Sequence, residues 1–504
     1  MSLKDKQKVV IIGAGPSGLT AAYELCKAEV ESVVLEKDNV VGGISRTVNY
    51  KDYLFDIGGH RFFTKVKAVD EFWHEVLSNG NFLRRGRLSR IYYNRKFFNY
   101  PLRATNALFG LGVWNSFLIF LSYTKAQMSP IKPEVSFEDW VRNRFGKRLY
   151  EIFFKTYTEK VWGIPCNEIS AEWASQRIQG LSLFSAVKNA LISAPSGDKN
   201  AVIKTLIDAF DYPEKGPGMM WETVAEIVQK NGSSLKMEAS VEKILWNEKG
   251  ITAVEIKNAD GATEVIEGTD FISSMPIREL VRKMSPAVPQ EILDAANNLG
   301  YRDFLTVALI IDKADLFQDN WIYIHDSAVK VGRIQNFKNW SPKMVPDETK
   351  TCLGLEYFCF KGDDLWTMAD ADLISLATKE LAQLELVNAA DVIDGSVVRM
   401  PKAYPIYDSI YAEMLQTIRN FLDGLGNLYL VGRNGMHKYN NQDHSMLTAM
   451  LSVKNILGAN YDVWEVNVEQ EYHEEMKADE RSELAELGST QPRVPKRIEK
   501  SNGN

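Results

Sequence analysis

The sequence predicts an α/β fold that combines a Rossmann-type dinucleotide-binding domain, an inserted helical domain and a second, antiparallel sheet on the substrate side. Three observations support this prediction. Residues 9–36 follow a strand, glycine turn, helix, strand and acid pattern; residues 104–215 are mostly helical in pattern; and residues 301–360 alternate as a sheet does. The 504 residues are enough for two or three domains.

The glycine-rich stretch near the N-terminus has a physical role for each of its parts. The apolar run Val9–Ile12 leads into Gly13-x-Gly15-x-x-Gly18, and a second apolar run ends on Glu36. Gly13 allows a tight turn, Gly15 lets a pyrophosphate approach the backbone, and Gly18 lets the helix pack closely on the strand. The helix N-terminus offers free N–H groups to phosphates, and Glu36 is placed to accept from ribose hydroxyls. The stretch predicts dinucleotide binding; the alternative is a glycine-rich turn in an ordinary βαβ unit.

A second glycine motif, Gly42-Gly43-Ile44-Ser45-Arg46-Thr47, follows Glu36 after a short gap. It resembles the second glycine motif of the large FAD-binding oxidoreductase superfamily that includes amine oxidases, protoporphyrinogen oxidases and UDP-galactopyranose mutases. A plain NAD-binding domain does not need this motif, so the sequence favours FAD over NAD. The residues predicted to bind FAD are Gly13, Gly15, Pro16, Ser17, Gly18, Glu36, Lys37, Gly43, Ile44, Ser45, Arg46, Gly59, His60, Val241, Gly432 and Arg433.

The chain is predicted to leave this Rossmann-type FAD-binding domain and return to it. Residues 1–103 form its first part and include a basic, aromatic hairpin with Asn94-Arg95 at the turn, which faces either an anionic ligand or solvent. The later parts are predicted as an inserted helical domain (104–215), FAD-binding domain (216–300), substrate-side sheet domain (301–415), FAD-binding domain (416–465) and a charged, partly disordered tail (466–504).

Composition and local patterns exclude several classes of protein. The net charge of −7 does not indicate a nucleic-acid partner. The four cysteines form no CxxC pair, which predicts no metal site and a reducing cytoplasm. Met1–Lys8 is polar, so no signal peptide is expected. The apolar segment 104–121 contains Asn106 and Asn115, so a buried helix or helix pair is favoured over a membrane span; peripheral contact with lipid or a lipid-linked substrate is the alternative.

Three later strings resemble the UDP-galactopyranose mutase family, the flavin-dependent sugar ring-contraction enzymes. They are residues 157–163 (YTEKVWG) with Arg177 further on, residues 332–338 (GRIQNFK) and residues 432–441 (GRNGMHKYNN). Gly58-Gly59-His60 and residues 403–406 (AYPI) are shorter similarities. The matches occur in the family's order and extend from residue 9 to about 455.

This resemblance implies a role for each matching residue. Two arginines would hold the diphosphate of a nucleotide-sugar through planar guanidinium forks, two tyrosines would give hydroxyls to phosphate or sugar, and an aromatic pair would line the base and sugar positions. Arg433 and His60 would lie beside the flavin. The implied catalytic residues are His60, Arg177, Arg333, Tyr404 and Tyr439. The implied substrate-binding residues are Tyr157, Trp162, Arg177, Arg333, Tyr404, Tyr439 and Asn441.

The resemblance also implies the chemistry. FAD would be active when reduced by an external reductant such as NAD(P)H. The flavin N5 would attack the anomeric carbon of the nucleotide-sugar, and the sugar–flavin adduct would open and reclose with a different ring size, without net redox change. A role in cell-surface polysaccharide biosynthesis is implied with it.

Two positions depart from the family pattern. Asn441 stands where the family has an acid, and Phe63 stands where it has a second histidine. An oxidase or desaturase of the protoporphyrinogen oxidase type, acting on an apolar or amine substrate, is therefore a second interpretation, and a non-catalytic flavoprotein is a third. Against the oxidase, residues 428–433 end in Gly-Arg, where amine oxidases usually carry Gly-Glu.

Overall fold

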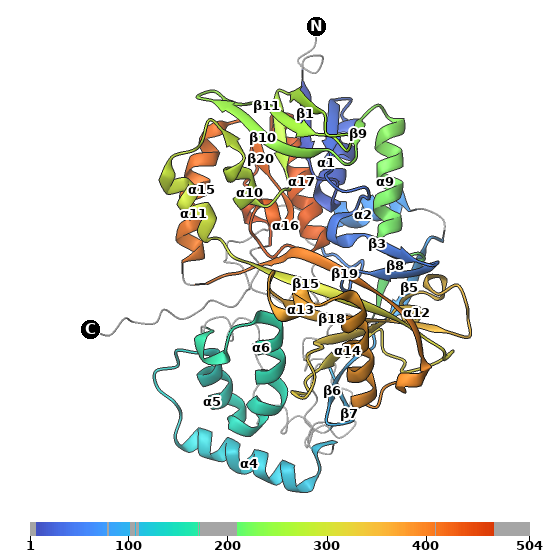
Figure 1. Cartoon of the computed structure of the whole chain (residues 1–504). Helices are drawn as coiled ribbons and strands as arrows, with labels where there is room; N and C mark the ends of the chain where they lie inside the picture. Colours follow the sequence, from blue (N-terminus) through green and yellow to red (C-terminus); the bar gives the residue numbers. More distant parts are fainter. Residues whose placement is uncertain are drawn as a thin grey trace, which may run out of the picture.

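The structure, a computed structural model, describes residues 7–77, 80–100, 106, 110–169, 171, 209–408 and 410–467 (Figure 1). Arg177 lies outside the described residues, and so does most of the predicted charged tail, from residue 468 onward. Three larger sheets and the helices that cover them make up the described part.

A five-stranded parallel sheet forms the first layer, with strand order β20-β13-β1-β2-β9. Its strands are β1 (Lys8–Ile12), β2 (Glu31–Leu35), β9 (Ser234–Lys236), β13 (Asp270–Ser273) and β20 (Leu428–Leu430). Both faces are covered, as parallel sheets require. Val9 and Ile11 of β1 enter a core with helices α1 (Pro16–Lys27), α9 (Gly218–Lys230) and α17 (Gln442–Ile456), whereas Val10 and Ile12 enter a second core on the other face.

The second core lies under a four-stranded sheet, in the order β12-β11-β10-β14. Its strands are β10 (Ser240–Asn247), β11 (Gly250–Lys257), β12 (Thr263–Glu267) and β14 (Met284–Ser285). Helices α10 (Ile277–Arg282), α11 (Gln290–Asn298) and α15 (Tyr411–Leu422) share this core. Val241, predicted to contact the cofactor, is a buried residue of β10 in this sheet and not of the parallel sheet.

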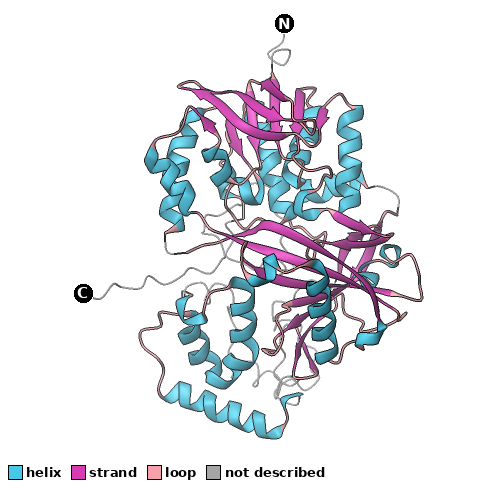
Figure 2. Ribbon diagram, in the orientation of Figure 1, coloured by secondary structure: helices cyan, strands magenta, loops and turns pink. Residues whose placement is uncertain are grey.

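A seven-stranded sheet crosses the middle of the molecule (Figure 2), in the order β19-β15-β18-β17-β16-β6-β7. Its strands are β6 (Ser89–Tyr93), β7 (Lys96–Asn99), β15 (Tyr301–Ile311), β16 (Trp321–Ile324), β17 (Arg333–Asn336), β18 (Thr351–Cys359) and β19 (Val392–Pro405). Every neighbouring pair is antiparallel except β16 and β6, which are parallel. Helix α14 (Asp370–Gln383) packs on this sheet through Leu373, Ala377 and Leu381.

The predicted hairpin is present, but it belongs to a different part of the molecule. β6 and β7 pair as expected, and Asn94 and Arg95 adopt φ values of 48° and 60°, the left-handed pair of a tight two-residue turn. The sequence placed this hairpin with residues 1–103 of the FAD-binding domain; the structure instead adds it to the seven-stranded sheet through β16. Ile91 and Phe98 explain this position, because both are buried against the helical region.

The helical region contains α4 (Val113–Met128), α5 (Phe137–Tyr150), the π-helical turn η3 (Glu151–Lys155) and α6 (Thr156–Trp162). A capping box begins α5: the backbone N–H of Asp139 donates to Ser136, and the backbone N–H of Ser136 donates to Asp139. The prediction that the apolar segment 104–121 is buried is wrong for α4. Most of its apolar side chains are exposed, although Ile119 is buried, because its polar side chains Asn115 and Ser122 bind α5.

The remaining elements connect these layers. They are β3 (Thr47–Tyr50), β4 (Tyr53–Asp56), α2 (Lys67–Val76), β5 (Phe82–Gly86), β8 (Ala209–Pro213), α12 (Phe337–Trp340), α13 (Asp364–Thr367) and α16 (Gly432–Gly435), with the short turns η2 (Gly43–Ser45), η4 (Cys166–Glu168), η5 (Pro342–Met344), η6 (Ala389–Asp391), η7 (Asp423–Leu425) and η8 (Val463–Glu465). Among the helices described, none combines the length and hydropathy that crossing a membrane demands.

Candidate functional site

Two glycine turns meet at the carboxyl ends of β1 and β2. The N–H of Gly13 donates to the Leu35 carbonyl at 2.8 Å, and its φ of +100° is one that side chains rarely tolerate. A Cβ on Gly18 would lie 1.8 Å from the carbonyl oxygen of Gly13, so only glycine fits there. A Cβ on Gly15 would meet only the Cα of Gly43, at 3.9 Å. The two turns therefore face each other with bare backbone, as a pyrophosphate cradle requires.

Glu36 is held beneath this cradle. Its carboxylate accepts from the backbone N–H of Ala14 at 2.8 Å and from that of Asp38 at 2.9 Å, and the residue is buried. Arg46 pairs with Asp38 at 2.5 Å, which ties the second glycine motif to the same corner. Lys37 is exposed. Because a carboxylate has about four acceptor positions, Glu36 retains capacity for ribose hydroxyls.

Two helix N-termini approach this corner. Helix α1 begins after Gly15 with no side-chain cap, so its first N–H groups are available to an anion. At the start of α17, the side-chain oxygen and nitrogen of Gln442 are buried and have no hydrogen-bond partner among the described residues. Buried amides without partners are costly, so a polar ligand is expected there. The cradle and this unpaired amide fit FAD.

Arg433 joins the cradle to an aromatic cluster. Gly432, the first residue of α16, approaches the start of α1 so closely that a Cβ would lie 2.7 Å from the Ser17 hydroxyl. The Arg433 guanidinium donates to the carbonyls of Asn440 at 2.9 Å and Ala403 at 3.0 Å. It lies 5.5 Å from the ring centre of Tyr404 and 4.9 Å from that of Tyr439.

The two tyrosines stack on each other, with 5.6 Å between ring centres and 18° between planes. Burial raises the pKa of Tyr404 to about 12, although the positive charge of Arg333 acts to lower it. The Tyr404 hydroxyl therefore keeps its proton at neutral pH. Trp162, at the end of α6, makes an edge contact with Tyr439 at 6.3 Å. Tyrosine hydroxyls and a tryptophan edge thus lie close together, beside Arg433.

Arg333 is fixed by a buried carboxylate. Its Nε donates to Glu356, which is 1% exposed, and its Nη2 donates to the Tyr404 hydroxyl at 3.3 Å. Gln335 donates to the other oxygen of Glu356 at 2.5 Å. Burial alone would lower the pKa of Arg333, but the Glu356 carboxylate raises it well above its usual value. The guanidinium is therefore permanently charged and oriented.

His60 lies in the loop after β4, where Gly58 has a φ of +85°. Burial, together with the positive charge of Arg433, lowers the pKa of the imidazole to about 3. Its Nδ1 is buried without a hydrogen-bond partner among the described residues. His60 is therefore neutral at physiological pH, beside two arginines.

Helix α6 is docked on the seven-stranded sheet by Lys160. The ammonium donates to three carbonyls, those of Ile324 at 3.4 Å, Asp326 at 2.6 Å and Val331 at 3.1 Å. Burial lowers its pKa to about 8. One turn earlier, Tyr157 stacks on His325 with 4.9 Å between ring centres. Lys160 thereby sets the position of Tyr157 and Trp162.

The structure brings together most of the residues predicted to be catalytic or substrate-binding. His60, Arg333, Tyr404, Arg433, Tyr439 and Trp162 form one cluster, which Ile44 joins through its packing on the Phe304, Phe358 and Ala403 core. Asn441 begins α17, where its backbone N–H donates to the His444 imidazole at 3.3 Å. Sequence reasoning missed Glu356, Gln335, Lys160 and Gln442. The signal for Glu356 was a lone acid inside the apolar strand β18.

Comparisons with known proteins identify the family and the fold. A family model described as flavin containing amine oxidoreductase matches residues 16–442. A probable UDP-galactopyranose mutase of Klebsiella pneumoniae is 27% identical over 174 residues, which cover 33% of this chain and 44% of that protein. An L-amino-acid oxidase of Crotalus adamanteus is 44% identical over 66 residues, 13% of each chain. The matched regions thus span less than half the length of these relatives.

Two solved structures are similar over most of the chain. A reduced UDP-galactopyranose mutase has a TM-score of 0.76 at 21% identity, with 90% of this chain and 94% of that chain covered. A putative protoporphyrinogen oxidase from Exiguobacterium sp. 255-15 has a TM-score of 0.64 at 16% identity, with 90% and 99% covered. These likenesses confirm the predicted α/β fold, and the family match supports FAD as the cofactor of a flavin enzyme. The chain belongs to the flavin containing amine oxidoreductase family, as a member that resembles UDP-galactopyranose mutase.

Proposed function

We propose that this flavin enzyme acts on a nucleotide-sugar or a related phosphorylated sugar, and that it changes the ring size of the sugar without net oxidation. The observation that carries the proposal is Arg333, a fixed and permanently charged guanidinium beside the stacked pair Tyr404 and Tyr439. Its contacts with described residues use two of its five N–H donors, so three are available for a diphosphate. An apolar or amine substrate gives such a group nothing to bind.

The residues of the cluster have distinct roles in this proposal. Arg333 and the hydroxyls of Tyr404 and Tyr439 bind the diphosphate before it leaves and after it returns. Trp162 packs beside the sugar and excludes water. His60 keeps one imidazole nitrogen as an acceptor and one as a donor, because it is neutral, and so orients hydroxyl groups. Arg177, outside the described residues, remains a predicted second diphosphate ligand.

The cofactor supplies the chemistry that side chains lack. FAD, when bound and reduced, offers a nucleophilic nitrogen to the anomeric carbon of the sugar. The cation of Arg433 beside the cradle favours the anionic reduced flavin. The proposal includes an external reductant such as NAD(P)H, because a reaction without net redox change cannot itself reduce the flavin.

An anaerobic titration tests the proposal. The purified yellow protein is reduced with dithionite, and UDP and other nucleoside diphosphates are added while the flavin spectrum is followed. We expect a saturable spectral change that Arg333→Ala abolishes while FAD stays bound. Arg399→Ala is the matched control, since Arg399 lies on strand β19 of the same sheet and pairs with Asp370 at 2.6 Å. If no nucleoside diphosphate perturbs the flavin, or if Arg333→Ala binds as well as wild type, the proposal is wrong.

A second candidate is an oxidase or desaturase of the protoporphyrinogen oxidase type. The similarity to the Exiguobacterium structure and to the snake L-amino-acid oxidase favours it. Oxygen consumption that depends on an amine or an apolar substrate, with no response to nucleoside diphosphates, would establish this alternative.

A further inference from the structure

Helix α4 is oriented with its apolar face outward. Its exposed side chains form one stripe along the helix, with exposed fractions from 46% to 88%: Val113, Trp114, Phe117, Phe120, Leu121 and Met128. Figure 1 shows α4 at the lower edge of the molecule, beneath α5. A helix of a water-soluble domain normally shows the reverse orientation, so this stripe marks a contact surface.

The inward face of α4 is held by specific polar contacts. Arg148 of α5 donates from its Nη2 to the Asn115 side chain at 2.6 Å and from its backbone N–H to the Ser122 hydroxyl at 3.1 Å. Gly146, with a φ of +77°, lets the backbones approach, since a Cβ there would lie 2.8 Å from the N of Tyr123. These contacts fix which face points outward, so the exposed stripe is a property of the fold.

The stretch of sequence that contains α4 carries charge of one sign. Residues 76–133 contain nine arginines and lysines and no aspartate or glutamate, in a chain whose net charge is −7. Some of these arginines pair with distant acids, such as Arg90 with Asp319 at 2.6 Å. Lys125 and Lys132, at and beyond the end of α4, are exposed and make no ion pair with any residue that the structure describes.

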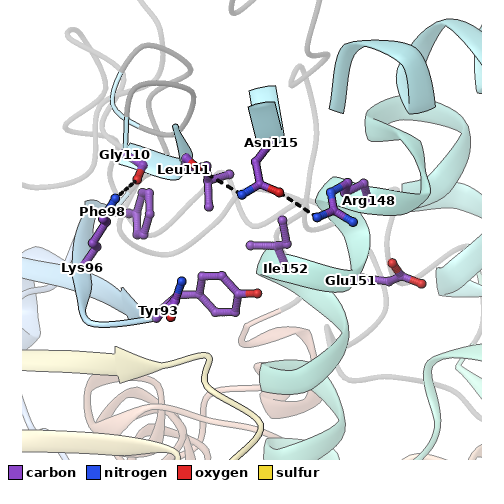
Figure 3. Close-up of a pocket in the computed structure, with 10 residues that line it drawn as sticks. Tyr93, Lys96, Phe98, Gly110, Leu111, Asn115, Arg148, Glu151 and Ile152 are labelled. Carbon is purple, nitrogen blue, oxygen red and sulfur yellow. Dashed lines mark hydrogen bonds between the residues drawn. The ribbon is translucent and has the colours of Figure 1, made fainter. Parts of the chain in front are cut away.

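A cavity of about 230 Å³ lies behind the helix, between the β6–β7 hairpin and η3 (Figure 3). Tyr93, Phe98 and Ile152 give it apolar walls, and Lys96 and Arg148 give it cations. Figure 3 shows Asn115 and Arg148 pointing toward each other across it. The Nε of Arg148 is buried without a partner among the described residues, and Glu151 is the acid in the lining. The cavity therefore places two cations next to the inner face of α4.

We propose that α4 and the basic residues around it bind the surface of a membrane that contains anionic phospholipid. The aromatic and aliphatic stripe enters the boundary between headgroups and acyl chains, while Lys125 and Lys132 face headgroup phosphates. A second copy of this chain is a weaker occupant. Two copies that meet through this face would bring like charges together, whereas an anionic bilayer neutralises them.

The test uses the full-length, FAD-loaded protein and sedimentation with vesicles of phosphatidylcholine, with and without phosphatidylglycerol. We expect binding on the order of tenfold tighter to the vesicles with phosphatidylglycerol at low salt, and a loss of that preference at high salt. The double variant Lys125→Glu/Lys132→Glu should lose the preference for anionic lipid. Phe117→Glu/Phe120→Glu should reduce binding at least tenfold.

Controls keep the result specific. Val265→Glu is the matched control, because Val265 is an equally exposed apolar residue (53%) on β12, in the four-stranded sheet. FAD absorbance shows that each variant is folded, and Trp114→Ser repeats the test at a single position. The proposal is overturned if wild type ignores anionic vesicles or if Val265→Glu loses binding equally. It is also overturned if wild type is a dimer in solution that Phe117→Glu converts to a monomer. None of these outcomes depends on the nucleoside diphosphate titration.

Discussion

The variant Glu356→Gln should show how much the buried carboxylate that binds Arg333 contributes to the free energy of unfolding. The carboxylate is 1% exposed and serves two donors, the Nε of Arg333 and the amide of Gln335. Removing one partner of a buried ion pair costs about 3–5 kcal/mol, because the other charge is left without compensation. The Arg333 side chain is 24% exposed and keeps some contact with water, so we expect about 3 kcal/mol, the lower end of that range.

Urea denaturation followed by tryptophan fluorescence measures this loss as a shift of the midpoint at unchanged slope. The matched control is Glu264→Gln, which neutralises the exposed pair between Lys236 and Glu264, 2.8 Å apart. Pairs at the surface contribute about 0–1 kcal/mol, so the control should be nearly unaffected. Arg333→Met and the double variant complete a mutant cycle, in which the coupling should account for most of the loss.

Two results would each refute this reasoning. If Glu356→Gln loses no more stability than Glu264→Gln, the carboxylate is not the buried partner that holds Arg333. A mutant cycle without coupling would lead to the same conclusion, even if each single variant were destabilised.

Three further predictions concern buried groups and close packing. Burial raises the pKa of Asp56 from 3.8 to about 7, so the folded state binds this proton more tightly. The contribution of Asp56 to the free energy of unfolding should therefore fall by about 3 kcal/mol between pH 4 and pH 7, and Asp56→Asn should remove that part of the slope in urea midpoints measured across this range. Gly18→Ala places a Cβ 1.8 Å from the Gly13 carbonyl oxygen, so it should lower the free energy of unfolding by about 3 kcal/mol in urea denaturation and reduce the FAD content measured by flavin absorbance. Gly424→Ala is the control, because a Cβ there meets no atom within 4 Å and should change neither quantity. The pKa of His60 is lowered to about 3, so His60→Gln should leave the shape of the pH profile of nucleoside diphosphate binding unchanged from pH 5 to pH 8.

Each of these three predictions would be contradicted by a specific result. If the difference in stability between wild type and Asp56→Asn is the same at pH 4 and at pH 7, Asp56 titrates normally. Gly18→Ala with full flavin content would contradict the close approach of helix and strand. A pH inflection near 6.5 that His60→Gln removes would show that the imidazole is solvated.

The parts of the fold that the sequence predicted are those set by local rules. The turn at Asn94-Arg95 follows from backbone conformation over a few residues, and β1, α1 and β2 follow from a glycine pattern within one βαβ unit. The pairing of β6 with β16 was not predictable in the same way. It joins Ile91 to Tyr323, more than two hundred residues later, and nothing local marks that partnership.

The same difference between local and long-range determinants applies to the candidate site. Arg333 could be identified from a motif, but its partner could not, because Glu356 lies opposite it only in the antiparallel register of β17 and β18. The outward orientation of α4 was missed for a related reason. Hydropathy shows that the segment is apolar, whereas its orientation depends on Arg148, a residue of another helix that binds Asn115.

The short turn α16 has a thermodynamic consequence. Gly432 lies against Ser17 at the start of α1, and the next residue, Arg433, lies over Tyr404 and Tyr439. One peptide unit therefore connects the cofactor corner to the residues proposed to bind the diphosphate. If a ligand on either side immobilises this unit, it lowers the entropy cost of binding on the other side, by the same factor in both directions. The change in anion affinity when flavin binds then equals the change in flavin affinity when the anion binds, and a preparation depleted of flavin would bind anions weakly with every proposed anion-binding residue intact.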